Sequence, residues 1–240
     1  MGAPPFSKPF MYWVGMDLDP AISTAEKAEL SDFYSRVHVP EVVGGNAGFV
    51  GGSRYELLDP DPRGGVHAGP RWLAAYELEN EAAATTYAQR NAGAVAADNP
   101  KYSAWPDSRK YLKIVWRMQW RHLATCGNAS EPPESIFMVG MNVPPDTDPA
   151  GLADFNTFYT HTHVPEVMEY GGYARGTRFE LHHAFAHPEP GCPRFCAIYE
   201  ADAAATEHRN ERLANRAPLS SGPPTWEKHD TIWRLVYQRL

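Results

Sequence analysis

The 240-residue sequence has no run of about 18 apolar residues, and its opening, MGAPPFSKPF, lacks the apolar core of a secretory signal. These absences argue against a membrane-spanning helix and predict a cytoplasmic protein. Cysteine is also scarce. Cys126, Cys192 and Cys196 are odd in number, and their spacing matches no disulfide framework or zinc site, which fits a reducing compartment.

Basic charge is in short supply as well. The chain has 22 Lys and Arg against 29 Asp and Glu, for a net charge of −7. Without a basic stripe to neutralise phosphates, nucleic acids and anionic membranes are not expected partners. The G-x-S-x-G and H-E-x-x-H motifs are missing too, so neither a serine nucleophile elbow nor a common zinc motif is predicted. Small molecules or proteins remain as partners.

What the sequence does contain is an internal duplication. The segment HVPEV occurs twice, and four further blocks recur in the same order, which is the pattern of two related units in one chain. We predict a first unit at residues 11–123, a linker at 124–135 and a second unit at 136–240. The matched blocks are residues 11–20 with 136–145, 31–42 with 156–167, 48–57 with 172–181, 70–77 with 193–200, and 116–120 with 233–237.

Hydrophobic periodicity predicts the same elements in each unit. Short apolar and aromatic runs predict strands, while Ser23 with Glu26 forms a capping box that predicts a helix start. The proline of HVPEV predicts that the first helix of each unit ends at His38 or His163. The order is strand, helix, strand, strand, helix, strand, the ferredoxin-like unit of the α+β class. Two such β-α-β-β-α-β repeats, each with one bare sheet face, are expected to pack sheet to sheet as a single-chain α+β barrel.

These motifs resemble a known family. A tyrosine, then H-x-P-E, then a glycine-aromatic turn and a strand with R-[YF]-x-L is similar to the EthD-like members of the dimeric α+β barrel superfamily, which pair two separate chains. The resemblance implies a pocket between sheet and helices and no metal or organic cofactor. It also implies proton transfer by the histidine of H-x-P, at His38 and His163.

The candidate catalytic residues are these two histidines and two tyrosines. An imidazole can take and return a proton near neutral pH, and a helix C-terminus would raise its basicity. Tyr34 and Tyr159 precede His38 and His163 by one helical turn on the same face. His163 has the more polar surroundings, at residues 160–162. The alternative is that each histidine only caps its helix.

The candidate substrate-binding residues lie at strand positions that are expected to face the barrel interior. Alternation places Arg54 with Glu56, and Arg178 with Glu180, on one face of a strand. An arginine fork there would bind a carboxylate, while the alternative is that Arg and Glu satisfy each other. The full set is Arg178, Arg54, Arg234 and Arg117, with Trp72, Tyr76 and Tyr199 as aromatic walls or, alternatively, as plain core packing.

Two further features bear on the site. His182, His183 and His187, together with His161 and His163, raise a metal site as an alternative, and the resemblance adds a haem site as its more specific form. The stretch around residues 182–187 reads as a loop without a recognised ligand spacing, and no haem-binding pattern is visible, so no metal or cofactor is predicted. The second unit has Tyr170 and Arg175 where the first has glycines. We therefore expect one competent pocket, involving the second unit.

Together these features predict an enzyme without a cofactor. The leading hypothesis is an ester hydrolase or isomerase that uses histidine acid-base chemistry on a small carboxylated aromatic derivative or ring-cleavage product in aromatic catabolism. The alternatives are a polyketide-type cyclase or dehydratase, a cofactor-free monooxygenase, and a non-catalytic small-molecule binding protein. The expected partner is a small anionic aromatic or dienoic substrate, and a homodimer is left open.

Overall fold

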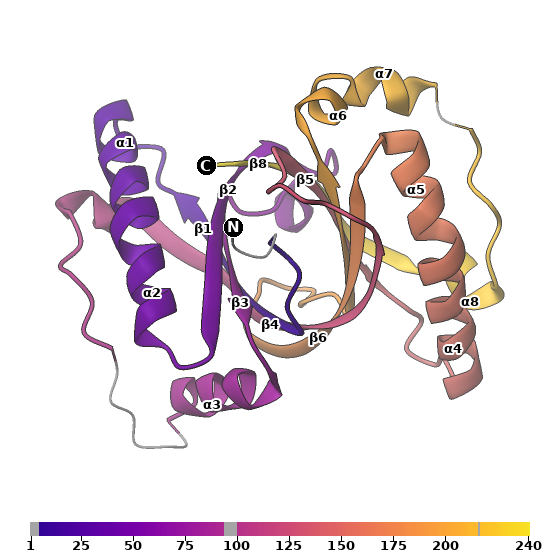
Figure 1. Cartoon of the computed structure of the whole chain (residues 1–240), viewed down its shortest axis with the longest axis horizontal. Coiled ribbons are helices and arrows are strands. Elements are labelled where there is room, and N and C mark those ends of the chain that lie inside the picture. Colours follow the sequence, from indigo (N-terminus) through magenta and orange to yellow (C-terminus); the bar gives the residue numbers. More distant parts are fainter. Residues whose placement is uncertain (1–4, 94–99, 216) are drawn as a thin grey trace.

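The computed structural model describes residues 5–93, 100–215 and 217–240. Eight antiparallel strands form a closed barrel, and two helical layers lie on opposite sides of it (Figure 1). In the first half the elements are β1 (Phe10–Leu18), α1 (Thr24–Phe33), the π-helical turn η1 (Tyr34–His38), α2 (Val39–Gly45), β2 (Phe49–Asp59), the 3₁₀ turn η2 (Gly65–His67), β3 (Trp72–Leu78), α3 (Glu81–Asn91), the 3₁₀ turn η3 (Asp107–Tyr111) and β4 (Leu112–Gly127).

The second half begins with β5. Its elements are β5 (Ser135–Asn142), α4 (Pro149–Phe158), the π-helical turn η4 (Tyr159–His163), α5 (Val164–Gly171), β6 (Arg175–Ala186), β7 (Phe195–Ala201), α6 (Ala203–Glu207), α7 (Arg209–Ala214), α8 (Pro224–Glu227) and β8 (Asp230–Arg239).

The strand order shows how the barrel closes. Around the barrel it runs β1-β3-β2-β8-β5-β7-β6-β4 and returns to β1. The two halves are joined by hydrogen-bonded strand pairs, β2 with β8 and β4 with β6, of which Tyr55 opposite Arg239 is one register point. The predicted α+β class is confirmed. The predicted single-chain barrel is confirmed too, but its two sheets do not pack as separate layers: they form one continuous, closed sheet.

The barrel interior is apolar and aromatic. Trp13, Trp116, Trp120 and Trp233 are fully buried there, and the rings of Trp116 and Trp233 stack at 5.3 Å between centroids. Burying so much aromatic surface is a large hydrophobic contribution to stability. The interior is therefore a packed core.

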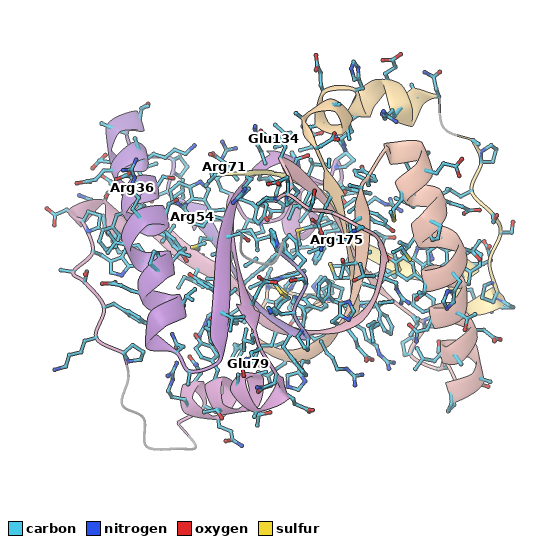
Figure 2. All side chains as sticks on the ribbon, viewed as in Figure 1. Arg36, Arg54, Arg71, Glu79, Glu134 and Arg175 are labelled. Atoms are coloured by element: carbon cyan, nitrogen blue, oxygen red, sulfur yellow. The ribbon has the colours of Figure 1, made fainter. Side chains whose placement is uncertain are left out.

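This core overturns the expected direction of the strand side chains. Tyr55 and Phe179 point into the barrel, whereas Arg54 and Arg178 lie on the opposite face, under the helices (Figure 2 shows Arg54). Alternation fixed which residues share a face but could not tell which face the helices cover. The interior would also leave a guanidinium without polar partners, at a high desolvation cost.

The helix that carries each histidine does not end where the sequence predicted. In the first half α1, η1 and α2 follow one another without a break, and Val39 donates its N–H to the carbonyl of Tyr34, five residues earlier. Pro40 has no N–H, and in an α-helix its ring would clash with the carbonyl four residues before it. The wider π turn accommodates the proline, as it does between Tyr159 and Val164. His38 and His163 thus lie within helices.

In the part of the chain that the structure describes, no helix is long and apolar enough to span a membrane.

Candidate functional site

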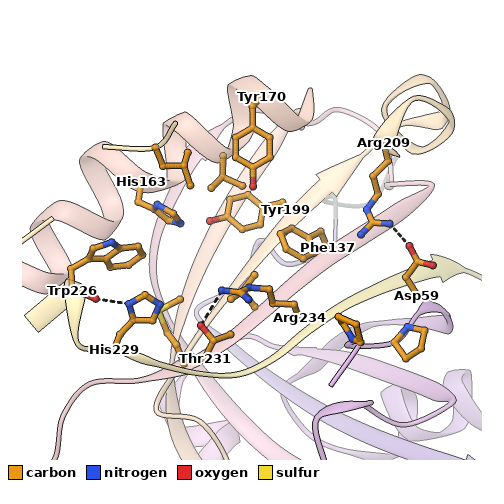
Figure 3. A pocket seen from close by; sticks show the side chains of 16 residues that line it. Asp59, Phe137, His163, Tyr170, Tyr199, Arg209, Trp226, His229, Thr231 and Arg234 are labelled. Atoms are coloured by element: carbon orange, nitrogen blue, oxygen red, sulfur yellow. Dashed lines mark hydrogen bonds and ion pairs between the residues drawn. The ribbon is translucent and has the colours of Figure 1, made fainter. Parts of the chain in front are cut away.

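A cavity of about 490 Å³ opens between the helices and the sheet of the second half (Figure 3). Its volume is within the roughly 300–1,000 Å³ usual for small-molecule and cofactor sites. Four helical segments and three strands of this half line it, together with the end of β2 from the first half. The lining residues are Asp59, Pro60, Pro62, Phe137, Val139, Met141, His163, Val167, Tyr170, Tyr199, Arg209, Leu219, Trp226, His229, Thr231 and Arg234.

His163 comes to this cavity from the π-helical turn η4. Burial lowers the pKa of His163 to about 4, and the nearby Glu166 offsets only part of that effect. The imidazole is therefore neutral at physiological pH, which corrects the expectation that a helix C-terminus would make it more basic. Its Nδ1 is buried and has no hydrogen-bond partner among the described residues.

Trp226 and His229 form the same wall, and the sequence reasoning missed both. The Trp226 ring lies 4.3 Å from the His163 ring and 4.6 Å from the His229 ring, centroid to centroid. His229 Nδ1 is hydrogen-bonded to the backbone carbonyl of Trp226 (Figure 3). A carbonyl only accepts, so Nδ1 donates, and Nε2 carries the lone pair in the neutral ring. The one sequence signal was a tryptophan ahead of the last strand in both halves, Trp105 and Trp226.

Arg234 brings positive charge to the cavity from β8. Its Nη2 donates to Thr231 Oγ1 over 3.4 Å, a long hydrogen bond. Among the described residues no carboxylate forms an ion pair with the guanidinium of Arg234, which leaves that group available for an anionic ligand.

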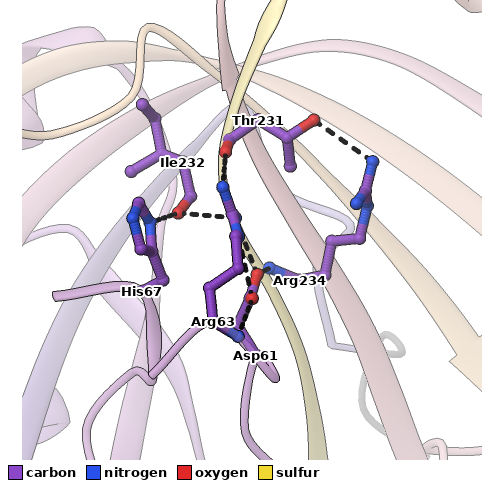
Figure 4. A network of polar contacts seen from close by, with 6 residues as sticks. All are labelled: Asp61, Arg63, His67, Thr231, Ile232 and Arg234. Atoms are coloured by element: carbon purple, nitrogen blue, oxygen red, sulfur yellow. Dashed lines mark hydrogen bonds and ion pairs between the residues drawn. The ribbon is translucent and has the colours of Figure 1, made fainter. Parts of the chain in front are cut away.

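The backbone around Arg234 is held by a loop from the first half (Figure 4). Asp61 is buried and accepts hydrogen bonds from Arg63 Nη2 at 2.7 Å and from the Arg234 backbone N–H at 2.9 Å. Arg63 also donates to the carbonyl of Thr231 at 2.7 Å. Burial alone would raise the pKa of Asp61, but the hydrogen bonds from Arg63 and Arg234 outweigh it and hold that pKa at about 2. The loop thus fixes the start of β8, where the cavity residues lie.

The predicted arginines at 54 and 178 do not line either helix-covered cavity. Arg178 is 1% exposed and donates to the Asn156 carbonyl at 3.1 Å, to Asn156 Oδ1 at 2.8 Å and to Thr160 Oγ1 at 2.6 Å. Its guanidinium carbon lies 4.1 Å from the centroid of the Tyr159 ring. Arg54 makes the matching contacts to Ser31 and to Ser35. Through these hydrogen bonds, each arginine links a helix to the strand beneath it.

The alternative that the Arg and Glu of the R-x-E motifs satisfy each other is wrong. Glu56 forms ion pairs with Lys27 and Arg71, and Glu180 forms them with Arg121 and Arg194. Trp72 lies beneath Arg54, at 4.7 Å, and belongs to the helix-covered layer of the first half. Arg175, which we expected to charge the second pocket, is instead buried in an ion pair with Glu200 at 2.7 Å.

A smaller cavity of about 190 Å³ occupies the matching place in the first half. His38 lies in it with Trp105 at 4.4 Å, and burial lowers the pKa of His38 to about 4. Arg117 Nε donates to the hydroxyl of Tyr12 at 2.8 Å, and Nη2 donates to Asn91. Tyr34, Tyr76 and Arg117, all predicted site residues, line this cavity, whereas His163, Tyr199 and Arg234 line the larger one.

The other predicted site residues are not among those that line either cavity. Tyr159 is fully buried, with its ring 5.5 Å from that of His163. His182 and His183 belong to β6, so the predicted loop is a strand there. Within residues 5–93, 100–215 and 217–240, no group of three or more His, Cys, Asp or Glu side chains converges as a metal site.

Comparison with known proteins identifies solved structures that share the fold of this chain. No protein-family model and no curated protein matches the chain. Among solved structures, a protein assigned as a chlorite dismutase (TA0507) matches with a TM-score of 0.52 at 13% identity, covering 96% of this chain and 94% of that one. A variant of chlorite dismutase from Candidatus Nitrospira defluvii matches with a TM-score of 0.51 at 7% identity, covering 96% and 90%. At such low identity the likeness establishes the shared fold alone.

These matches correct the family that the motifs suggested. The resemblance to EthD-like proteins is wrong, because the structures that match over nearly the whole chain are chlorite dismutases. The cofactor-independent hydrolase or isomerase of aromatic catabolism rested on that resemblance and is wrong with it. The cyclase, monooxygenase and binding-protein alternatives fit these matches no better.

Proposed function

We propose that the second-half cavity binds haem and that the protein is a haem-dependent enzyme. The proposal draws on the fold shared with chlorite dismutases, which are haem proteins. One observation carries it for this chain. The cavity combines an imidazole whose Nδ1 is tied to a backbone carbonyl with an arginine that no described carboxylate pairs.

The residues present fit this group. Haem iron is commonly held by a histidine, and a ligating histidine usually donates its other ring N–H to a carbonyl or carboxylate. His229 has that arrangement, so it is the better oriented candidate for holding the iron. His163 is the second candidate, since it is neutral and lines the cavity, but its buried Nδ1 has no partner among the described residues to orient the ring. Phe137, Tyr199 and Trp226 provide aromatic walls for a planar ring.

The other cavity residues would position the group. Arg234 can bind a carboxylate of the ring through its guanidinium, which no described carboxylate pairs, while Asp61 and Arg63 keep its backbone in place. Bound haem would supply a redox-active iron whose reactivity depends on the polarity of its pocket. The apolar side chains of Val139, Met141 and Val167 would limit the access of water to it.

Titration with hemin tests the proposal. Wild-type protein should bind one hemin per chain, with a shifted Soret band and quenched tryptophan fluorescence. H229A should keep its fold but lose the spectrum of a histidine-ligated iron, and free imidazole should restore it. H38A, in the small first-half cavity, is the matched control and should behave as wild type. A wild-type protein that does not bind hemin would rule the function out.

We also propose that the chain consists of two ferredoxin-like repeats. The strand orders β4-β1-β3-β2 and β8-β5-β7-β6, and the recurring sequence blocks, support two ferredoxin-like repeats at residues 11–123 and 136–240 joined by 124–135. Expressing each unit alone and measuring its folding by circular dichroism would test this division. The homodimer also stays a prediction, and sedimentation velocity would test it.

A further inference from the structure

An ion pair between the two halves of the chain lines the large cavity. Arg209 on α7 contacts Asp59 at the end of β2, so a residue of each half contributes (Figure 3). Both residues line the cavity. The Arg209 side chain is 22% exposed and that of Asp59 is 52% exposed. The pair therefore lies at the boundary between the cavity and solvent.

The two guanidiniums of the cavity thus differ in whether a described carboxylate forms an ion pair with them. Arg234 has no carboxylate partner among the described residues, whereas Arg209 already has one in Asp59. Ion pairs with half-exposed partners are weak, because water screens the attraction and competes for both groups. A ligand carboxylate could replace Asp59 on Arg209 at little cost, because Asp59 can turn to solvent.

We propose that Asp59 is a built-in competitor for the second carboxylate of the ligand. With the cavity empty it pairs with Arg209. A ligand with two carboxylates gives one to Arg234 and displaces Asp59 from Arg209 with the other. A ligand with one carboxylate binds Arg234 and leaves the ion pair between Asp59 and Arg209 intact. Like-charge repulsion from Asp59 then selects for ligands that gain enough from Arg209 to overcome it. The inference rests on the proposed function, because haem is a ligand with two carboxylates.

Binding measurements on the full chain test this inference. Hemin, with two carboxylates, and hemin dimethyl ester, with none, are titrated into wild type, D59N and R209Q. We expect D59N to bind hemin roughly tenfold more tightly and R209Q roughly tenfold more weakly. The dimethyl ester should bind all three proteins within about twofold of one another, since it has no carboxylate to form an ion pair with either arginine.

The exposed pair of Asp32 with Arg36 provides matched controls. Its side chains are 60% and 79% exposed and lie away from both cavities. D32N and R36Q should bind hemin as wild type does. Hemin affinity in D59N equal to that of wild type would overturn the inference alone and leave haem binding intact. A wild type that fails to bind hemin would overturn both. If D59N lowers the melting temperature, D59S also removes the carboxylate, and its hemin affinity is measured in place of that of D59N.

Discussion

The two cavities of this protein occupy matching places in the fold but differ in what their charged groups are doing. In the first half Arg117 is held by Tyr12 and Asn91, and rings fill the space down to about 190 Å³. In the second half the side chain of Arg234 has one long hydrogen bond among the described residues, to Thr231 Oγ1, and about 490 Å³ is open. A histidine against a tryptophan occurs in both. The difference teaches that the recurring histidine does not distinguish the two cavities, whereas the state of the arginine does.

The largest expected effect is on the free energy of unfolding, and it concerns the buried arginine that both halves have, Arg54 or Arg178. R178M should lower the free energy of unfolding by about 3 kcal/mol, because Asn156 and Thr160 lose the donor that satisfies them in a buried place. R54M should cost a similar amount in the first half, where Ser31 and Ser35 lose theirs. Urea unfolding measures both values. Near-native stability of either variant would show that the hydrogen bonds of that arginine do not stabilise the packing of its helix on the sheet.

The next effect should separate the halves. R234Q should weaken hemin binding by about 30-fold, since a charge-assisted contact of about 2 kcal/mol is lost. R117Q should change it by less than about twofold, because Arg117 is already engaged and lies in the other cavity. Fluorescence titration compares the two. Equal losses in both variants would contradict the assignment of the ligand to the second half.

Acid should affect the halves alike. Burial holds the pKa of both His38 and His163 at about 4, below the 6.5 of an unfolded chain. The unfolded state therefore binds more protons between pH 6.5 and 4, and stability falls as pH drops through that window. H38N and H163N should each remove about half of this acid-dependent loss, as read from melting temperatures at pH 7.5, 6 and 4.5. A variant with an unchanged pH dependence would show that its histidine is not buried in the neutral form.

The smallest effect concerns a pair found in one half. Asp32 and Arg36 form an exposed ion pair in the first half, and the matching positions in the second are Thr157 and His161. D32N should change the free energy of unfolding by less than about 0.5 kcal/mol. Thermal unfolding at low and high salt would measure it, and a larger loss would mean that this pair stabilises the first half specifically.

The sequence was informative where a pattern is local. It predicted the order of strands and helices, and it placed Arg54 with Glu56 on one face of a strand. It also predicted that Tyr170 would make the second pocket different, and Tyr170 does line the larger cavity. Capping and alternation depend on neighbours in the chain, so a single sequence can show them.

The rest depended on distant contacts. The side of each strand that faces the helices is decided by barrel closure, which alternation does not encode. The π turn before each proline arises because the helix continues to pack on the sheet and so resists ending there. Asp59 and Arg209 are 150 residues apart, and no local pattern links them. The resemblance to EthD-like proteins failed because its motifs are short and describe a shared unit of structure.

Closure of the barrel has a consequence for assembly. Each of the eight strands has hydrogen-bonded neighbours on both sides, so the described part of the sheet offers no free edge to another chain. A second copy is not required to complete the barrel. If copies associate, they would meet through helices or loops, and dilution to single chains should leave both cavities intact.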